Sequence, residues 1–137
     1  MKRFALALIL AMTAVFIPTL AGPALAGYEG DVIIGQEVVL RIRFPAGGLS
    51  VKERADRVTE RINNLLGSEP FNPSDVKVGV RNKEHVVLIG DKVIITADKR
   101  TAQFNKSTPE QLANMWAANL RRVIPKAKAQ PGEVQST

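Results

Sequence analysis

The sequence predicts a small α+β domain, in which an antiparallel sheet of about four to five strands carries two amphipathic helices on one face. Short runs rich in Val and Ile are separated by tight turns, which leave no room for the crossover helices of a parallel sheet. Two longer segments have helical periodicity behind capping motifs. The chain has no cysteine, so the fold must depend on its core and on backbone hydrogen bonds.

The first 26 residues have the pattern of a secretory signal peptide. Lys2 and Arg3 precede an uncharged run, residues 4–26, which ends in Ala24 and Ala26 at the positions that signal peptidase prefers. The run also exceeds the roughly 20 residues that cross a bilayer, so an uncleaved anchor is the alternative. Because the run contains two prolines and a good cleavage site, we predict cleavage before Gly27 and export to the periplasm or the exterior.

Residues 31–44 predict two strands around a turn at Gly35. In the second strand Val38, Leu40, Ile42 and Phe44 alternate with Glu37, Val39, Arg41 and Arg43, which is the period of a strand with one buried face. Pro45 is expected to end the ladder, since proline has no amide hydrogen to donate.

A helix is predicted from Ser50, because Ser50 and Glu53 form a capping box. Its apolar residues fall on one stripe, and Gly67 is expected to close it in the left-handed conformation that is usual after a helix. The stripe consists of Val51, Ala55, Val58, Ile62, Leu65 and Leu66.

Residues 76–97 predict a three-stranded antiparallel meander, with turns at Asn82-Lys83 and Gly90-Asp91. Asp98 is placed to cap a short helical stretch through Asn105. The element order is therefore β-β-α-β-β-β-α once the closing helix is added.

The closing helix is capped by Thr108 and Gln111, and Pro125 is expected to end it. Leu112, Trp116, Leu120, Val123 and Ile124 share its apolar face, so Trp116 is interpreted as a core residue. Asn119 lies near that face as a buried amide or a partner contact. We predict one α+β domain at residues 27–125 and a disordered tail at residues 126–137, which has little apolar content.

The charge balance is moderately basic. There are 19 Lys and Arg against 13 Asp and Glu; without Lys2 and Arg3 this leaves 17 against 13, a net charge of +4. Such an excess favours anionic surroundings, such as phospholipid headgroups or wall polymers, and does not by itself indicate nucleic acid. For an exported protein we expect no nucleic-acid partner, and we expect a membrane partner only if the N-terminal segment is retained.

Two basic regions are candidate binding surfaces for an anionic partner. Arg54, Arg57 and Arg61 share a flank of the first helix, and Arg41 and Arg43, with Lys77 and Arg81, lie on the polar side of the strands. The alternative interpretation is that each is a solvated face, whose arginine stems cover the edge of the core. The two regions are not expected to coincide, because the helix should cover the opposite side of the sheet.

No sequence pattern in the chain indicates a catalytic reaction, a cofactor site or a metal site. His85 is the single histidine, and without cysteine or a second histidine a zinc site would need mainly carboxylates, which is unusual. No nucleophile-elbow spacing appears. We therefore predict no catalytic residue, no metal and no cofactor. The alternative is a small hydrolase that uses carboxylates and His85.

Several segments resemble the extracytoplasmic segment that precedes the membrane helices in some bacterial small-conductance mechanosensitive channel family proteins. They are "GQEVVLRIR", "GLSVKERADRVTERI", "DVKVGVRN", "IGDKVIITADKRTAQ" and "TPEQLANMWAANLRRVI", and Ser50, Glu53, Arg54 and Ala55 are the most specific part. The chain has no pore helices, so conduction does not follow from the resemblance. It implies an exported accessory module that contacts envelope components or membrane proteins.

The function predicted from the sequence is that of a non-enzymatic binding module of the cell envelope. Its expected partner is an envelope protein or an anionic polymer. A membrane-tethered sensor, which keeps its N-terminal segment as an anchor, is a further alternative. The oligomeric state stays open.

Overall fold

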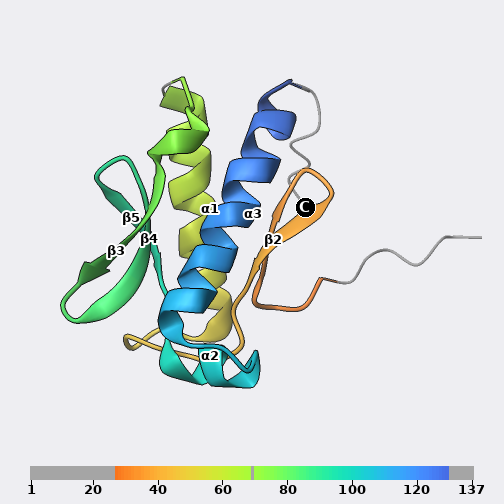
Figure 1. The fold of residues 1–137 in the computed structure, drawn as a ribbon. Coiled ribbons are helices and arrows are strands. Elements are labelled where there is room, and N and C mark those ends of the chain that lie inside the picture. The colour runs from red at the N-terminus through yellow and green to blue at the C-terminus, as the bar shows by residue number, and fades with distance from the viewer. Residues whose placement is uncertain (1–26, 69, 130–137) are drawn as a thin grey trace, which may run out of the picture.

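A computed structural model describes residues 27–68 and 70–129 (Figure 1). The predicted signal segment and most of the predicted tail lie outside these residues. The α+β class is confirmed. The elements in chain order are β1 (Asp31–Ile34), β2 (Glu37–Arg41), α1 (Val51–Ser68), the 3₁₀ helix η1 (Pro73–Asp75), β3 (Val76–Arg81), β4 (Glu84–Ile89), β5 (Lys92–Thr96), α2 (Lys99–Phe104) and α3 (Pro109–Ala129).

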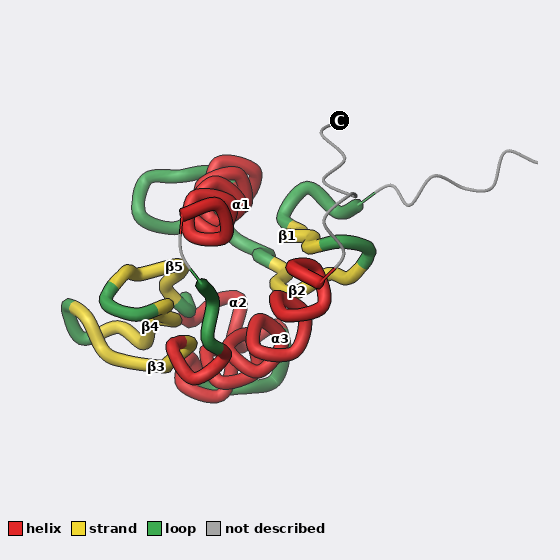
Figure 2. The backbone as a smooth tube through the Cα atoms, turned by 90° about the horizontal axis from the view of Figure 1, so that it is seen from above, coloured by secondary structure: helices red, strands yellow, loops and turns green. Residues whose placement is uncertain are grey.

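The strands form two separate antiparallel sheets rather than the one sheet that was predicted. β1 pairs only with β2, and β3, β4 and β5 form the three-stranded meander. The two long helices lie between the sheets when the molecule is seen from above (Figure 2). α1 packs against β1 and β5, and α3 packs against β2, β3 and β4. Each helix thus buries apolar surface against both sheets, which one sheet with helices on one face could not provide.

A β-bulge in the first hairpin changes which side chains of β2 are buried. Val32 pairs with Leu40 and Ile33 with Val38, so Val39 is the extra residue in the ladder. Val39 and Leu40 are therefore both 1% exposed, whereas Val38 is 40% exposed. The predicted alternation is wrong at Val38 and Val39 because a single inserted residue shifts the faces on either side of it.

The predicted helix caps are confirmed. The backbone amide of Ser50 donates to Glu53 Oε2 (2.8 Å) and the amide of Glu53 to Ser50 Oγ (3.2 Å). Hydrogen bonding to the Glu53 carboxyl by Ser50, first from its backbone amide and then from its side chain, holds the pKa of this carboxyl below its ordinary value. Thr108 and Gln111 form the same reciprocal pair at the start of α3. Asp98 accepts from the amide of Thr101 (2.8 Å) and caps α2.

The predicted ends of both long helices are wrong. Gly67 lies within the last turn of α1 and does not adopt a positive φ. α3 continues through Pro125 to Ala129, so part of the predicted tail is helical. Pro125 loses one backbone bond, but Ala127 packs against the core and Lys126 Nζ lies 3.4 Å from Glu37 Oε1, which stabilise the added turn.

The hydrophobic core lies around the helices and reaches both sheets. Its buried members fall between Val32 and Ile124, and Trp116, which is 3% exposed, is among them as predicted. A chain beginning at Gly27 therefore carries every core residue that the structure describes. Asn119 donates to the carbonyl of Val39 (3.1 Å), so this amide ties α3 to the bulge of β2. Within residues 27–68 and 70–129, no helix combines the length and hydropathy that crossing a membrane requires.

Candidate functional site

Two neighbouring hollows lie beside the second half of α1. The larger, of about 310 Å³, is lined by Arg61, Asn64, Leu65, Lys92, Val93 and Ile94. The smaller, of about 120 Å³, is lined by Leu65, Pro70, Phe71, Asp75, Ile89, Gly90, Asp91 and Lys92. Because Leu65 and Lys92 line both hollows, we treat the two as one groove, called the α1–β5 groove below.

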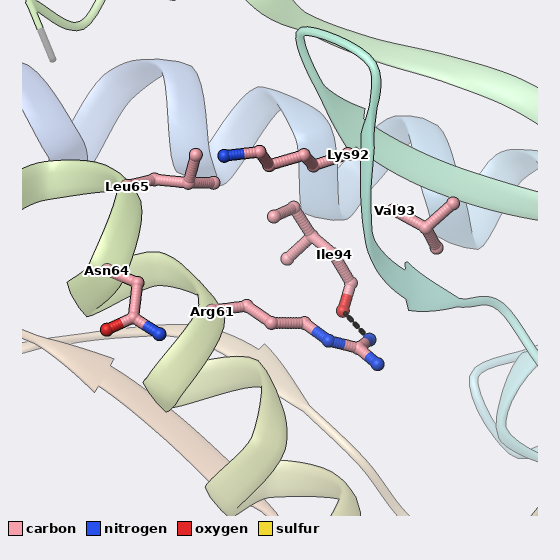
Figure 3. A pocket seen from close by; sticks show the side chains of 6 residues that line it. All are labelled: Arg61, Asn64, Leu65, Lys92, Val93 and Ile94. Carbon is pink, nitrogen blue, oxygen red and sulfur yellow. Dashed lines mark hydrogen bonds between the residues drawn. The ribbon is translucent and has the colours of Figure 1, made fainter. Parts of the chain in front are cut away.

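The α1–β5 groove combines apolar residues with charged and amide side chains. Ile94 of β5 and Leu65 of α1 lie on facing sides and the Lys92 side chain extends toward Leu65, whereas the Val93 side chain points away from α1 (Figure 3). Arg61 and Lys92 supply positive charge in the larger hollow, and Asp75 and Asp91 supply carboxylates in the smaller one. Such a lining suits a ligand with an apolar face and polar edges, such as a sugar ring bearing amides or carboxylates.

Arg61 holds the wall of this groove together. Its Nη1 donates to the carbonyl of Ile94 (3.0 Å), as the dashed line in Figure 3 shows. This bond ties α1 to β5 and satisfies a carbonyl at the β-bulge, where Ile94 is the extra residue between the pairs Val87–Ile95 and Leu88–Val93. Arg61 thus positions the groove, and its remaining donors stay available to a ligand.

Arg54 is buried rather than solvated, because the chain surrounds it with acceptors. It is 7% exposed, and its Nη1 donates to the carbonyl of Phe44 (2.6 Å) and to Asp98 Oδ2 (2.9 Å). Its Nη2 donates to the carbonyl of Thr96 (3.1 Å). The guanidinium therefore joins the end of β5, the start of α2 and the segment after β2. Arg57, one turn along α1, is exposed.

The two predicted strand arginines have different surroundings. Arg41 forms a two-point ion pair with Asp31 (2.5 and 2.8 Å), which offsets its charge. Arg43 lies between two aromatic rings, 5.1 Å from the centroid of Tyr28 and 4.9 Å from that of Phe104. The five predicted arginines are thus not gathered on one surface. Arg61 is in the groove, Arg57 is exposed on α1, Arg43 and Arg54 are near α2, and Arg41 is on the first hairpin.

His85 occupies a strand position. It is half-buried in β4, where its residue pairs with Val80 and its carbonyl accepts from the amide of Ala97 (2.9 Å). It lines neither hollow. Among the residues that the structure describes, no group of three or more His, Asp or Glu side chains is arranged to hold a metal ion.

Sequence reasoning missed most of the groove. Gly90-Asp91 was predicted as a turn and Lys92 as part of the meander, and Asn64 was not singled out. These residues meet only because α1 packs against β5, about thirty positions further along the chain. The one signal in the sequence was the presence of Arg61 and Lys92, two cations beside apolar positions of packing elements.

The family comparison gives one match over most of the chain. The family model described as "Domain of unknown function (DUF8459)" matches residues 31–127. This range begins at β1 and ends in the last turns of α3, so it contains both sheets and the α1–β5 groove. No solved structure matches the chain.

A curated protein from Synechocystis sp. is 38% identical to the chain over 76 residues. Its name is "Probable endolytic peptidoglycan transglycosylase RlpA". The match covers 53% of this chain but 23% of that protein, so the chain corresponds to less than a quarter of the relative's length. The relative's name contradicts our prediction from the sequence that the chain has no enzymatic role, because it is the name of an enzyme.

Proposed function

This chain belongs to the family described as Domain of unknown function (DUF8459), and on that premise we propose that it is a peptidoglycan-directed domain of the cell envelope. The α1–β5 groove is the site at which it contacts the glycan. The observation that carries the proposal is the lining of this groove, in which the half-buried Leu65 lies beside the cations of Arg61 and Lys92. The relative named for peptidoglycan supports this choice of ligand.

Peptidoglycan offers the groups that this lining would recognise. Its sugar rings have apolar faces that pack on aliphatic side chains, and their N-acetyl groups exchange hydrogen bonds with an amide such as Asn64. Its peptide stems carry carboxylates, which would pair with Lys92 and with the free donors of Arg61. The groove is open and of modest volume, as suits contact with a polymer rather than enclosure of a small molecule.

The proposal is tested by sedimentation of residues 27–137 with insoluble peptidoglycan. Lys92→Glu is expected to weaken binding by at least about tenfold, because a hydrogen bond to a charged group contributes about 1.5–3 kcal/mol. Lys83→Glu is the matched control. It makes the same charge change in the turn between β3 and β4, at the far end of β4 from the groove. Equal binding of peptidoglycan by Lys92→Glu and the wild type would exclude the groove as the binding site.

Glycan cleavage is a second candidate function, favoured by the relative's name and by the two carboxylates of the smaller hollow. A transglycosylase needs a carboxyl group that protonates the departing glycosidic oxygen and then, as the carboxylate, accepts a proton from the incoming hydroxyl. Asp75 or Asp91 would serve in this role.

Cleavage predicts that the chain releases soluble fragments from peptidoglycan. Either Asp91→Asn or Asp75→Asn should abolish the release while binding persists, because an amide cannot donate a carboxyl proton. Chromatography of the soluble fraction measures this. The absence of fragments with the wild-type chain would reject catalysis by these carboxylates. Release at the wild-type level by each of the two variants would reject it as well.

A further inference from the structure

A second surface with chemistry of its own lies around α2. Five residues form it, called the aromatic–arginine cluster: Tyr28, Arg43, Phe44, Arg100 and Phe104. Phe44 and Phe104 meet edge to face, with ring centroids 6.0 Å apart. Arg100 lies 4.5 Å from the centroid of Phe44, and Arg43 contacts the rings of both Tyr28 and Phe104.

The rings of this cluster are unusually exposed. Phe104 is 58% exposed and Tyr28 is 43% exposed. Exposed phenylalanine gathered with other aromatic residues, instead of scattered, marks a contact surface rather than a folding element. Tyr28 adds an apolar ring with a polar tip, a kind of side chain that is enriched where a membrane meets water.

The arginines of the cluster lack carboxylate partners among the residues that the structure describes. Asp98 pairs with Arg54 and Asp31 pairs with Arg41, so neither of these carboxylates pairs with the cluster. Arg43 Nε is enclosed and makes no hydrogen bond, so the aromatic faces are what hold this guanidinium in place. Lys99 and Lys106 flank α2 and are exposed, so they add positive charge.

The position of the cluster relates it to the N-terminal segment of the chain. Tyr28 follows the uncharged run of residues 4–26 after a single glycine. α2 lies at the end of the molecule where α1 begins, and the second half of α1, which lines the groove, lies at the other end (Figure 1). A surface that carries the cluster would therefore leave the α1–β5 groove facing away from it.

We propose that the aromatic–arginine cluster docks the domain on the surface of an anionic phospholipid bilayer. Phe104 and Tyr28 enter the interfacial region, and Arg43 and Arg100 bond the headgroup phosphates, which the guanidinium fork matches in two-point geometry. A bilayer is the partner that we choose, because it offers an apolar interfacial region to the exposed Phe104 ring and phosphates to the two arginines beside it. The inference stands independently of the proposed peptidoglycan contact.

Vesicle sedimentation with residues 27–137 tests the proposal without the apolar N-terminal run. We expect binding to vesicles of phosphatidylcholine and phosphatidylglycerol in equal parts, and little binding to phosphatidylcholine alone. Added salt should weaken binding, because salt screens the headgroup charge. Inorganic phosphate should compete no better than chloride at equal ionic strength. Stronger competition would indicate a site for free phosphate and would overturn bilayer docking.

Variants assign the binding to the cluster. Arg100→Gln should lower the vesicle partition coefficient roughly fivefold, the usual contribution of one cation near an anionic surface. Phe104→Ser should lower it roughly tenfold through lost apolar contact. Because Phe104 and Arg100 are both exposed, these changes should leave the thermal midpoint nearly unchanged.

Arg57→Gln and Met115→Ser are matched controls, at an exposed arginine of α1 and an exposed apolar residue of α3. Equal loss of vesicle binding in these controls would overturn the assignment to the cluster. No binding to anionic vesicles by the wild type, or loss of peptidoglycan sedimentation instead of vesicle binding in Phe104→Ser, would overturn membrane docking. Lys92→Glu should alter only the binding of peptidoglycan, so failures of the two proposals are distinguishable.

Discussion

Replacing Arg54 by alanine is expected to lower the free energy of unfolding by about 3–5 kcal/mol, the usual cost of removing one partner of a buried ion pair. The Arg54 guanidinium is 7% exposed and the Asp98 side chain 13% exposed. Without Arg54, the Asp98 carboxylate keeps only the amide of Thr101, and the carbonyls of Phe44 and Thr96 lose their donor. For a single domain of typical stability this loss is a large share of the total.

Urea unfolding followed by circular dichroism measures the effect of Arg54→Ala. Arg57→Ala is the control on the same helix, and as an exposed substitution it should change the stability by less than about 0.5 kcal/mol. The stability of Arg54→Lys should lie between those of Arg54→Ala and Arg57→Ala. An ammonium group keeps the charge, but it cannot donate in the two directions that the planar guanidinium reaches. Equal stability of Arg54→Ala and Arg57→Ala would show that the buried pair does not hold the three segments together.

Replacing Gly30 by alanine is expected to cost about 3 kcal/mol, in the range of an overpacked core position. A Cβ atom at Gly30 would lie 1.9 Å from the carbonyl oxygen of Ile42 and 2.6 Å from Val51 Cγ1. The clash involves backbone, so rotation of a side chain cannot relieve it. The amide of Ile42 donates to the carbonyl of Gly30 (2.8 Å), and the added methyl group would break this contact.

Gly67→Ala is the natural control for Gly30→Ala. Gly67 lies in the last turn of α1 with open space around it, so alanine there should be neutral or stabilising by up to about 1 kcal/mol. Thermal unfolding compares the two. Gly30→Ala should also weaken vesicle binding, since Tyr28 is two residues away. If Gly30→Ala unfolds at the wild-type temperature, the segment before β1 is not packed as described.

Local signals in the sequence predicted much of this fold. Ser50 with Glu53 and Thr108 with Gln111 are motifs within four residues, and each is formed as predicted. The apolar stripe of α1 and the meander of β3 to β5 also follow from short-range periodicity.

The features that were missed depend on distant segments. At the bulge, the carbonyl of Val39 accepts a hydrogen bond from Asn119, which lies 80 positions further along the chain. Arg54 pairs with Asp98 across 44 positions. Gly30 precedes the first predicted strand, and nothing in the sequence shows that Ile42 approaches it. The α1–β5 groove likewise arises from packing. The resemblance to mechanosensitive channel segments is not tested by these features and stays a prediction.

Peptidoglycan contact at the groove can be observed in a titration of isotopically labelled residues 27–137 with soluble peptidoglycan fragments, followed by the shifts of backbone amide resonances. We expect the shifts to concentrate at residues 61–65 and 91–94, which line the α1–β5 groove, and we expect Lys92→Glu but not Lys83→Glu to reduce them. Shifts that are absent, or that centre on another surface while these residues stay unperturbed, would contradict the groove as the site of peptidoglycan contact.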